Sequence, residues 1–174
     1  PRTMTMHRKG IPRLADDVIE LKSRNDRARI ALRGAEIREW SVVARELMWQ
    51  PDARFWGAVS PILFPLVGWS NDGHVRVDGE PYPMGVHGFA SSLDFRLVEH
   101  DESSALLRLT ESAQTLACYP FRFELSVRYR LHESALEAAF SVRNTDTRPL
   151  PFAIGIHPGF RWPFSATSRA GHGI

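Results

Sequence analysis

Apolar and polar residues alternate through much of the chain, most regularly between residues 121 and 131. Apolar side chains occupy every second position there, and polar side chains, mostly arginine, lie between them. Because successive side chains of a strand face opposite sides of a sheet, this run predicts one long half-buried strand. Residues 135–143 repeat the pattern after the short polar segment 132–134. The two runs are therefore predicted to pair as an antiparallel hairpin.

Shorter runs of the same kind predict further strands, at residues 18–22, 29–32, 36–40, 74–77, 95–100, 105–110 and 150–156. Turn sequences that tolerate positive φ separate some of them, for example 71–73 and 77–80. No window carries the apolar period of an amphipathic helix over three turns. These features predict an all-β fold, an antiparallel β-sandwich or barrel. Residues 1–174 are expected to form a single domain, with 1–16 as a flexible N-terminal arm.

The composition is that of a globular protein: 174 residues, 43% hydrophobic and 24% charged. A formal net charge of +2, with arginines scattered along the chain, favours neither a nucleic-acid partner nor a membrane-surface partner. The longest apolar stretch, 61–67, is too short to span a bilayer, so a cytoplasmic location is expected. The single cysteine, Cys118, excludes an internal disulfide and a multi-thiolate zinc site, and it is expected to pack rather than act as a nucleophile.

One block, residues 56–90, departs from the strand pattern and is rich in proline, glycine and aromatic residues. It is too apolar to be left in water, which predicts an ordered irregular segment lying over other structure. Trp69, within this block, could present a flat face to a sugar ring or could pack. Packing is the expected role of Trp56.

Two of the seven histidines have settings that suggest chemistry. His87 lies in an apolar, glycine-containing segment, and His157 ends a predicted strand in a His-Pro-Gly turn. Proline stops the ladder there, so His157 is expected at the rim of the sheet. Either histidine alone could equally be a core residue with satisfied nitrogens. Together they favour a shared cleft. Neither has an acidic or histidine partner at ligand spacing, so no metal site is predicted.

An ordered set of motifs carries a resemblance to a known family. The set is Gly34-Ala35-Glu36, Leu47-Met48-Trp49, Ser60-Pro61-Ile62-Leu63-Phe64-Pro65-Leu66-Val67-Gly68, His87-Gly88-Phe89-Ala90, Tyr119-Pro120-Phe121, Asn144 and Gly155-Ile156-His157-Pro158-Gly159-Phe160. From about residue 17 onward the chain resembles the aldose 1-epimerase (galactose mutarotase) family, in particular its LacX-like branch.

The resemblance implies a galactose mutarotase-like β-supersandwich with a pocket for a monosaccharide. It implies an isomerase that interconverts the α- and β-anomers of an aldose by ring opening and reclosure, without a cofactor. His157 matches the general acid and His87 the second pocket histidine. Trp69, Phe89 and Phe160 match positions near the sugar.

The chain also departs from the family pattern. Trp69 stands where the LacX-like branch usually has arginine, and Ser91 where arginine is frequent. No residue matches the family's base glutamate, so the chain is expected to be the N-terminal portion of an incomplete domain. Two alternatives stay open: a sugar-binding or regulatory relative without catalysis, and a hexose-phosphate epimerase using Arg161. A homodimer is also left open.

Overall fold

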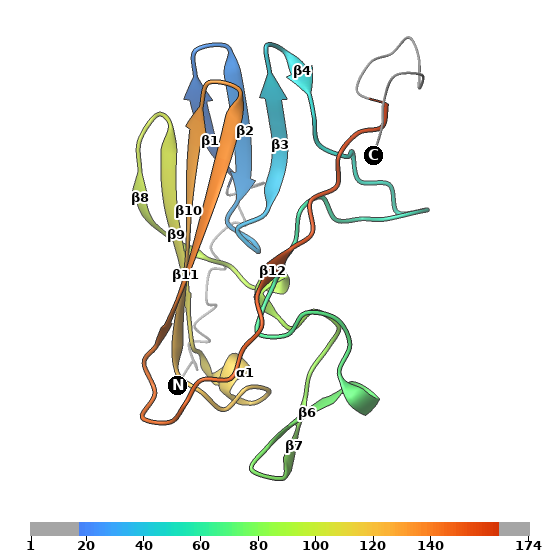
Figure 1. Ribbon diagram of the computed structural model, residues 1–174, viewed down its shortest axis with the longest axis vertical. Coiled ribbons are helices and arrows are strands. Elements are labelled where there is room, and N and C mark those ends of the chain that lie inside the picture. Colours follow the sequence, from blue (N-terminus) through green and yellow to red (C-terminus); the bar gives the residue numbers. More distant parts are fainter. Residues whose placement is uncertain (1–17, 164–174) are drawn as a thin grey trace, which may run out of the picture.

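The computed structural model describes residues 18–163 (Figure 1). This part of the chain contains four antiparallel sheets joined by irregular segments. Two sheets have four strands, in the orders β1-β2-β3-β4 and β11-β10-β9-β8, and two small sheets pair β12 with β5 and β6 with β7. The strands are β1 Val18–Ser23, β2 Asp26–Ala31, β3 Ile37–Val42, β4 Arg45–Glu46, β5 Ile62–Leu63, β6 His74–Val77, β7 Glu80–Pro83, β8 Arg96–His100, β9 Ser104–Thr110, β10 Phe123–His132, β11 Ala135–Asn144 and β12 Gly155–Ile156. The prediction of an all-β antiparallel fold is confirmed. The predicted N-terminal arm, 1–16, lies outside the described residues.

The long hairpin is formed by β10 and β11, which pair from Phe123 opposite Asn144 to His132 opposite Ala135. Every second side chain of β10, beginning with Phe123, is buried, whereas the side chains between them reach the surface. The alternation in the sequence therefore reports one buried and one solvated face. The buried carboxylate of Asp26 accepts hydrogen bonds from the amide N–H of Val43 and of Ser134, which ties the hairpin turn to the first sheet.

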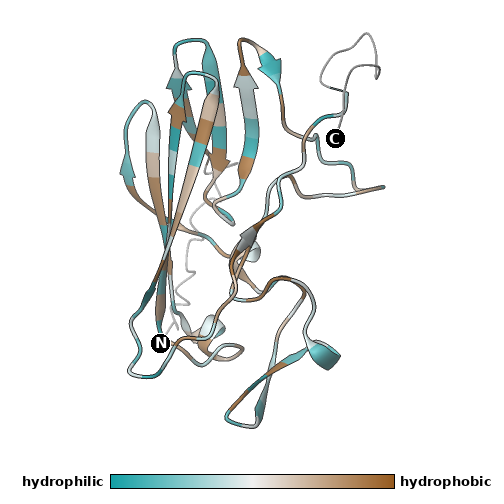
Figure 2. Cartoon of the chain, in the orientation of Figure 1, coloured by the Kyte–Doolittle hydropathy of each residue, from teal (hydrophilic) through white to brown (hydrophobic). Residues whose placement is uncertain are grey.

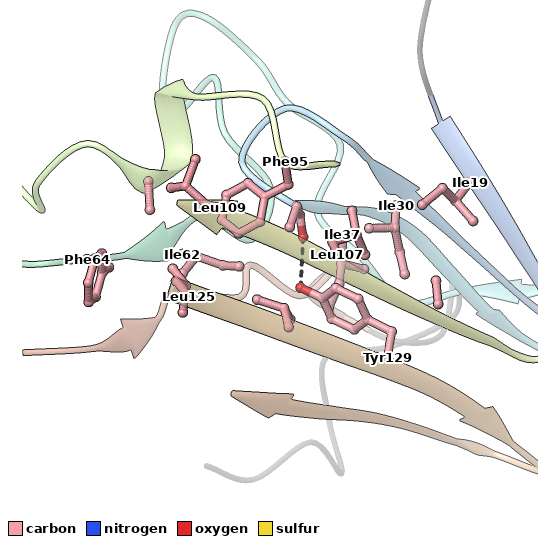
Figure 3. Packing of buried hydrophobic residues seen from close by; sticks show 14 of the residues in the cluster. Ile19, Ile30, Ile37, Ile62, Phe64, Phe95, Leu107, Leu109, Leu125 and Tyr129 are labelled. Carbon is pink, nitrogen blue, oxygen red and sulfur yellow. Dashed lines mark hydrogen bonds between the residues drawn. The ribbon is translucent and has the colours of Figure 1, made fainter. Parts of the chain in front are cut away.

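The hydrophobic core lies where the buried face of β10 meets β1 and β2 (Figure 3). Figure 2 shows hydrophobic and hydrophilic positions alternating along the strands of the two large sheets. Tyr129 is fully buried, and its hydroxyl donates to the carbonyl oxygen of Ala35 at 2.8 Å. Burial, with a smaller contribution from the charge of Glu36, raises the pKa of Tyr129 well above its usual range. The phenol therefore stays protonated and keeps this hydrogen bond.

The apolar block 56–90 is anchored to the second large sheet by an aromatic cluster. The ring of Phe64 lies 6.1 Å from Phe89, 6.3 Å from Tyr119 and 5.2 Å from Phe123, centroid to centroid. Tilted and edge-on ring pairs at such distances stabilise beyond their buried area. The expected ordered covering segment is thus present, and it brings β5 close to β10.

Some elements differ from the sequence-based expectation. Of the strand expected at 150–156, only Gly155–Ile156 joins a ladder. One-turn elements also occur, α1 Ala113–Leu116, η1 Asn71–Gly73 and η2 Ala90–Ser92. A capping box between Ser112 and Thr115 caps the N-terminus of α1. This helix is too short to show an apolar period in the sequence. No helix among residues 18–163 has the length and apolar character needed to cross a membrane.

Candidate functional site

The candidate site is built around β5, which hydrogen-bonds to a different segment on each edge. On one edge its neighbour is the chain around β12: the amide of His157 donates to the carbonyl of Pro61 at 3.1 Å. On the other edge, the amide of Phe64 donates to the carbonyl of His87 at 3.2 Å, and the amide of Phe89 donates to the carbonyl of Phe64 at 2.9 Å. The segments that carry His157 and His87 therefore flank the same strand.

The strand register places the backbone of each histidine relative to β5. Leu63 pairs with Gly155 of β12, two residues before His157, so the His157 segment continues this ladder beside Pro61. His87 lies in the turn before the Phe64–Gly88 bridge and has a positive φ of 63°, so strand alternation does not fix the direction of its side chain. Two strand spacings, about 10 Å, separate the two histidine backbones laterally.

The segment Val67–Gly68 contacts both histidine-bearing segments. The amide of Gly68 donates to Nδ1 of His87 at 3.0 Å, and the amide of His87 donates back to the carbonyl of Gly68 at 2.8 Å. A Cβ atom placed on Gly155 would lie 3.3 Å from a methyl group of Val67. Trp69 follows directly with 83% of its surface exposed. Trp69 is thus an exposed aromatic beside the His87 contact.

His87 is held in one tautomer by this contact. Its Nδ1 accepts the Gly68 hydrogen bond, and a neutral imidazole whose Nδ1 accepts carries its hydrogen on Nε2. The backbone of His87 has a positive φ of 63° and that of Gly88 one of 76°. A Cβ at Gly88 would overlap the carbonyl group of Phe64, so only glycine fits there. The result is a hydrogen-bond donor at a fixed position.

His157 has an exposed side chain, and neither ring nitrogen has a hydrogen-bond partner within residues 18–163. Its ring meets Trp56 edge-on, with centroids 5.0 Å apart and an interplanar angle of 87°. The carbonyl of Trp56 accepts from Nε1 of Trp49, and a Cβ on Gly159 would lie 2.6 Å from the Trp56 ring. Trp56 therefore packs, as expected, but what it packs against is the His157 turn.

Glu36 supports the chain that enters β5, a role that sequence reasoning missed. It is only 7% exposed, and its Oε1 accepts from the amides of Val59 at 2.7 Å and Ser60 at 2.9 Å. The carbonyl of Val59 in turn accepts from the amide of Gly159, two residues after His157. The only signal in the sequence was a glutamate between Ala35 and Ile37 in a strand-like stretch.

The three aromatic residues predicted near a sugar lie in different environments. Phe89 is 8% exposed and belongs to the aromatic cluster, so it lies behind the histidine segment rather than at the surface. Phe160 is 46% exposed and bridges Met48 beside the His157 turn. Trp69 and Phe160 therefore have faces available to a ligand.

No group of three or more histidine, cysteine, aspartate or glutamate side chains within residues 18–163 is arranged to hold a metal ion. Burial raises the pKa of the Cys118 thiol, which lowers its thiolate fraction and its reactivity. The chemistry of the candidate site thus depends on imidazole, aromatic faces and backbone groups.

This fold is a galactose mutarotase-like one. The structure superposes on a galactose mutarotase-like protein from Lactobacillus casei ATCC 334 with a TM-score of 0.80 and 36% identity, over 82% of this chain and 49% of that one. It superposes on a galactose mutarotase related enzyme from Lactobacillus acidophilus with a TM-score of 0.83 and 33% identity, over 90% of this chain and 51% of that one.

The chain belongs to the aldose 1-epimerase family, whose model matches residues 17–174. It is 36% identical over 124 residues to the chromosomal protein LacX of Lactococcus lactis subsp. lactis, a match that covers 68% of this chain and 42% of LacX. The LacX-like resemblance is thus confirmed. The chain spans about half the length of the relatives it matches.

Proposed function

We propose that this protein takes part in aldose 1-epimerisation, the interconversion of the α- and β-anomers of a monosaccharide. The observation that carries the proposal is the arrangement around β5, where the segments that carry His87 and His157 hydrogen-bond to opposite edges of one strand. Family membership supports a mutarotase-like role.

In the proposed reaction the C1–O5 bond of the sugar breaks while O5 takes a proton from His157. The O1 hydroxyl loses its proton to a base, and C1 becomes an aldehyde. After rotation about C1–C2, the steps reverse and the ring closes from the other face. Histidine suits this exchange because it titrates near neutrality and can both give and retake the proton.

His87 has a different part in this scheme. With Nδ1 occupied by the Gly68 amide, its Nε2–H is a fixed donor that can hydrogen-bond a sugar oxygen. Such a preorganised donor stabilises charge that develops on oxygen as the ring opens. The base is a glutamate by resemblance, and no residue among 1–174 matches it.

The test follows the equilibration of freshly dissolved α-glucose and α-galactose by polarimetry, with and without the whole gene product that contains this sequence. Acceleration over the uncatalysed rate is expected, and His157→Asn should reduce it by about 10²- to 10⁴-fold, the range of general acid catalysis. His132→Asn is the matched control, since His132 is an exposed histidine at the end of β10. If His157→Asn and His132→Asn keep equal rates, His157 is not the acid.

A second candidate function is sugar binding without turnover. Trp69 favours it, because an exposed indole that offers one N–H and a flat face stands where the resemblance implies an arginine. Saturable binding of the sugar that is lost in Trp69→Ala, together with an anomerisation rate equal to that of buffer, would identify the protein as a binder.

A further inference from the structure

A groove of about 730 Å³ lies away from the histidine segments. It is formed by η2 and the chain after it, the start of β8, the end of β9 and the chain that leads into α1. In Figure 1, β8 is at the far edge of its sheet from β12. The groove's lining residues include neither His87 nor His157, and the nearest lining residue to His87 in the chain is Ser92.

Three arginines line this groove with much of their hydrogen-bonding capacity free. Arg96 and Arg108 are directly opposite each other on β8 and β9, so two like charges share one face, which costs stability. Arg96 forms no ion pair or hydrogen bond within the described part of the chain. The nearest carboxylate contacts of the other two are long: 3.6 Å from Arg33 to Asp94 and 3.5 Å from Arg108 to Glu124.

Two carboxylates, those of Asp94 and Glu111, line the same groove. Asp94 is 75% exposed, and Glu111 accepts no hydrogen bond from residues 18–163. Guanidinium forks match phosphate oxygens, whereas carboxylates accept hydrogen bonds from hydroxyl groups. The volume lies within the range of small-molecule sites. The groove thus combines donors for one phosphate with acceptors for a polyol.

We infer that this groove binds a phosphate monoester of a polyol, such as a sugar phosphate, with the phosphate between Arg96 and Arg108 and the hydroxyls toward Asp94 and Glu111. Neither His87 nor His157 lines this site, and the inference does not depend on the proposed epimerase function. Binding is non-covalent, with no bond made or broken.

The test is a titration followed by ¹H–¹⁵N NMR with three probes: glucose 6-phosphate, inorganic phosphate and glucose. Glucose 6-phosphate is expected to shift the amide signals of residues 92–96 and 108–112 saturably, and glucose alone should leave them in place. Arg96→Ala should weaken binding by about tenfold or more, since it removes a charge-assisted contact. Arg96→Lys should restore only part of the affinity, because lysine keeps the charge and loses the fork.

Arg130→Ala is the matched control, because Arg130 is an exposed arginine on β10 that pairs with Glu137. It should leave the affinity unchanged. Equal weakening by Arg96→Ala and Arg130→Ala would show diffuse charge attraction only and overturn the inference, as would the absence of shifts at 92–96. If inorganic phosphate binds as tightly as the sugar phosphate, the source is free phosphate and the role given to Asp94 and Glu111 is wrong.

Discussion

Replacing Glu36 with leucine should destabilise the protein far more than replacing the exposed Glu39 of the following strand, β3. One oxygen of the buried Glu36 carboxylate accepts from the amides of Val59 and Ser60, and both of those residues are themselves buried. A buried donor left without its acceptor costs about 1–3 kcal/mol. Two such donors give an expected loss of about 2–6 kcal/mol in the free energy of unfolding.

Glu36→Gln separates the hydrogen bonds from the charge. Because both amides bind the same oxygen, glutamine can keep both acceptor contacts, while charge-assisted bonds are about twice as strong as neutral ones. The glutamine variant should therefore lose about half as much as the leucine variant. Glu39→Leu is the control: Glu39 is 41% exposed and pairs with Arg29 at the surface, a contact worth about 0–1 kcal/mol.

Urea unfolding followed by tryptophan fluorescence measures all three variants. The reasoning is refuted if Glu36→Leu costs no more than Glu39→Leu, or if Glu36→Gln is as damaging as Glu36→Leu. If only the leucine variant lacks a cooperative unfolding transition in urea, the result agrees with the upper end of the expected loss in unfolding free energy.

Three further results are expected. Gly88→Ala should destabilise by at least about 2 kcal/mol in urea unfolding, because positive φ disfavours a side chain and the added Cβ has no space, whereas Gly57→Ala, which meets no atom within 4 Å, should change little. Since the pKa of Tyr129 is raised in the fold, the unfolding free energy should be unaffected by this group below about pH 10 and fall above it by up to about 1.4 kcal/mol per pH unit. A pH series of urea curves should show that Tyr129→Phe reduces this slope; an unchanged slope would contradict the assignment. Trp56→Ala should lower kcat of the proposed reaction about two- to tenfold with little change in KM, and Trp56→Phe should retain most of it, because an edge-on ring contact orients His157. Equal rates for the alanine variant and wild type would remove that positioning role.

The sequence predicts the longer strands and the four-residue β6 well, but it misses β4, β5 and β7 and overextends β12, for a physical reason. β10 buries every second side chain and β11 partly buries every second one, so their alternation is strong and their ends fall within two residues of the expected positions. β5 and β12 have two residues each and exist because they pair with each other. Whether such short segments form strands depends on tertiary contacts, and the hydrophobic pattern of the surrounding sequence says little about it.

The candidate site was predictable in its segments and not in its contacts. Motif order places the His87 and His157 segments in one family pattern, and the structure puts both beside β5. That Trp56 meets His157, or that Phe89 turns into the aromatic cluster, depends on distances between residues far apart in sequence. Periodicity carries no information about such pairs.

The pairing of β5 with β12 has a consequence for the order in which segments can fold while the chain is being synthesised. Ile62 and Leu63 leave the ribosome long before their partners Ile156 and Gly155 are synthesised. Local hairpins such as β1–β2 and β6–β7 close short loops and can form at once, whereas the β5 edge must wait for a distant segment. A nascent chain arrested before residue 155 would already contain the cluster of Phe64, Phe89, Tyr119 and Phe123, yet the β5 edge that pairs with β12 would be open and His157 would not be synthesised.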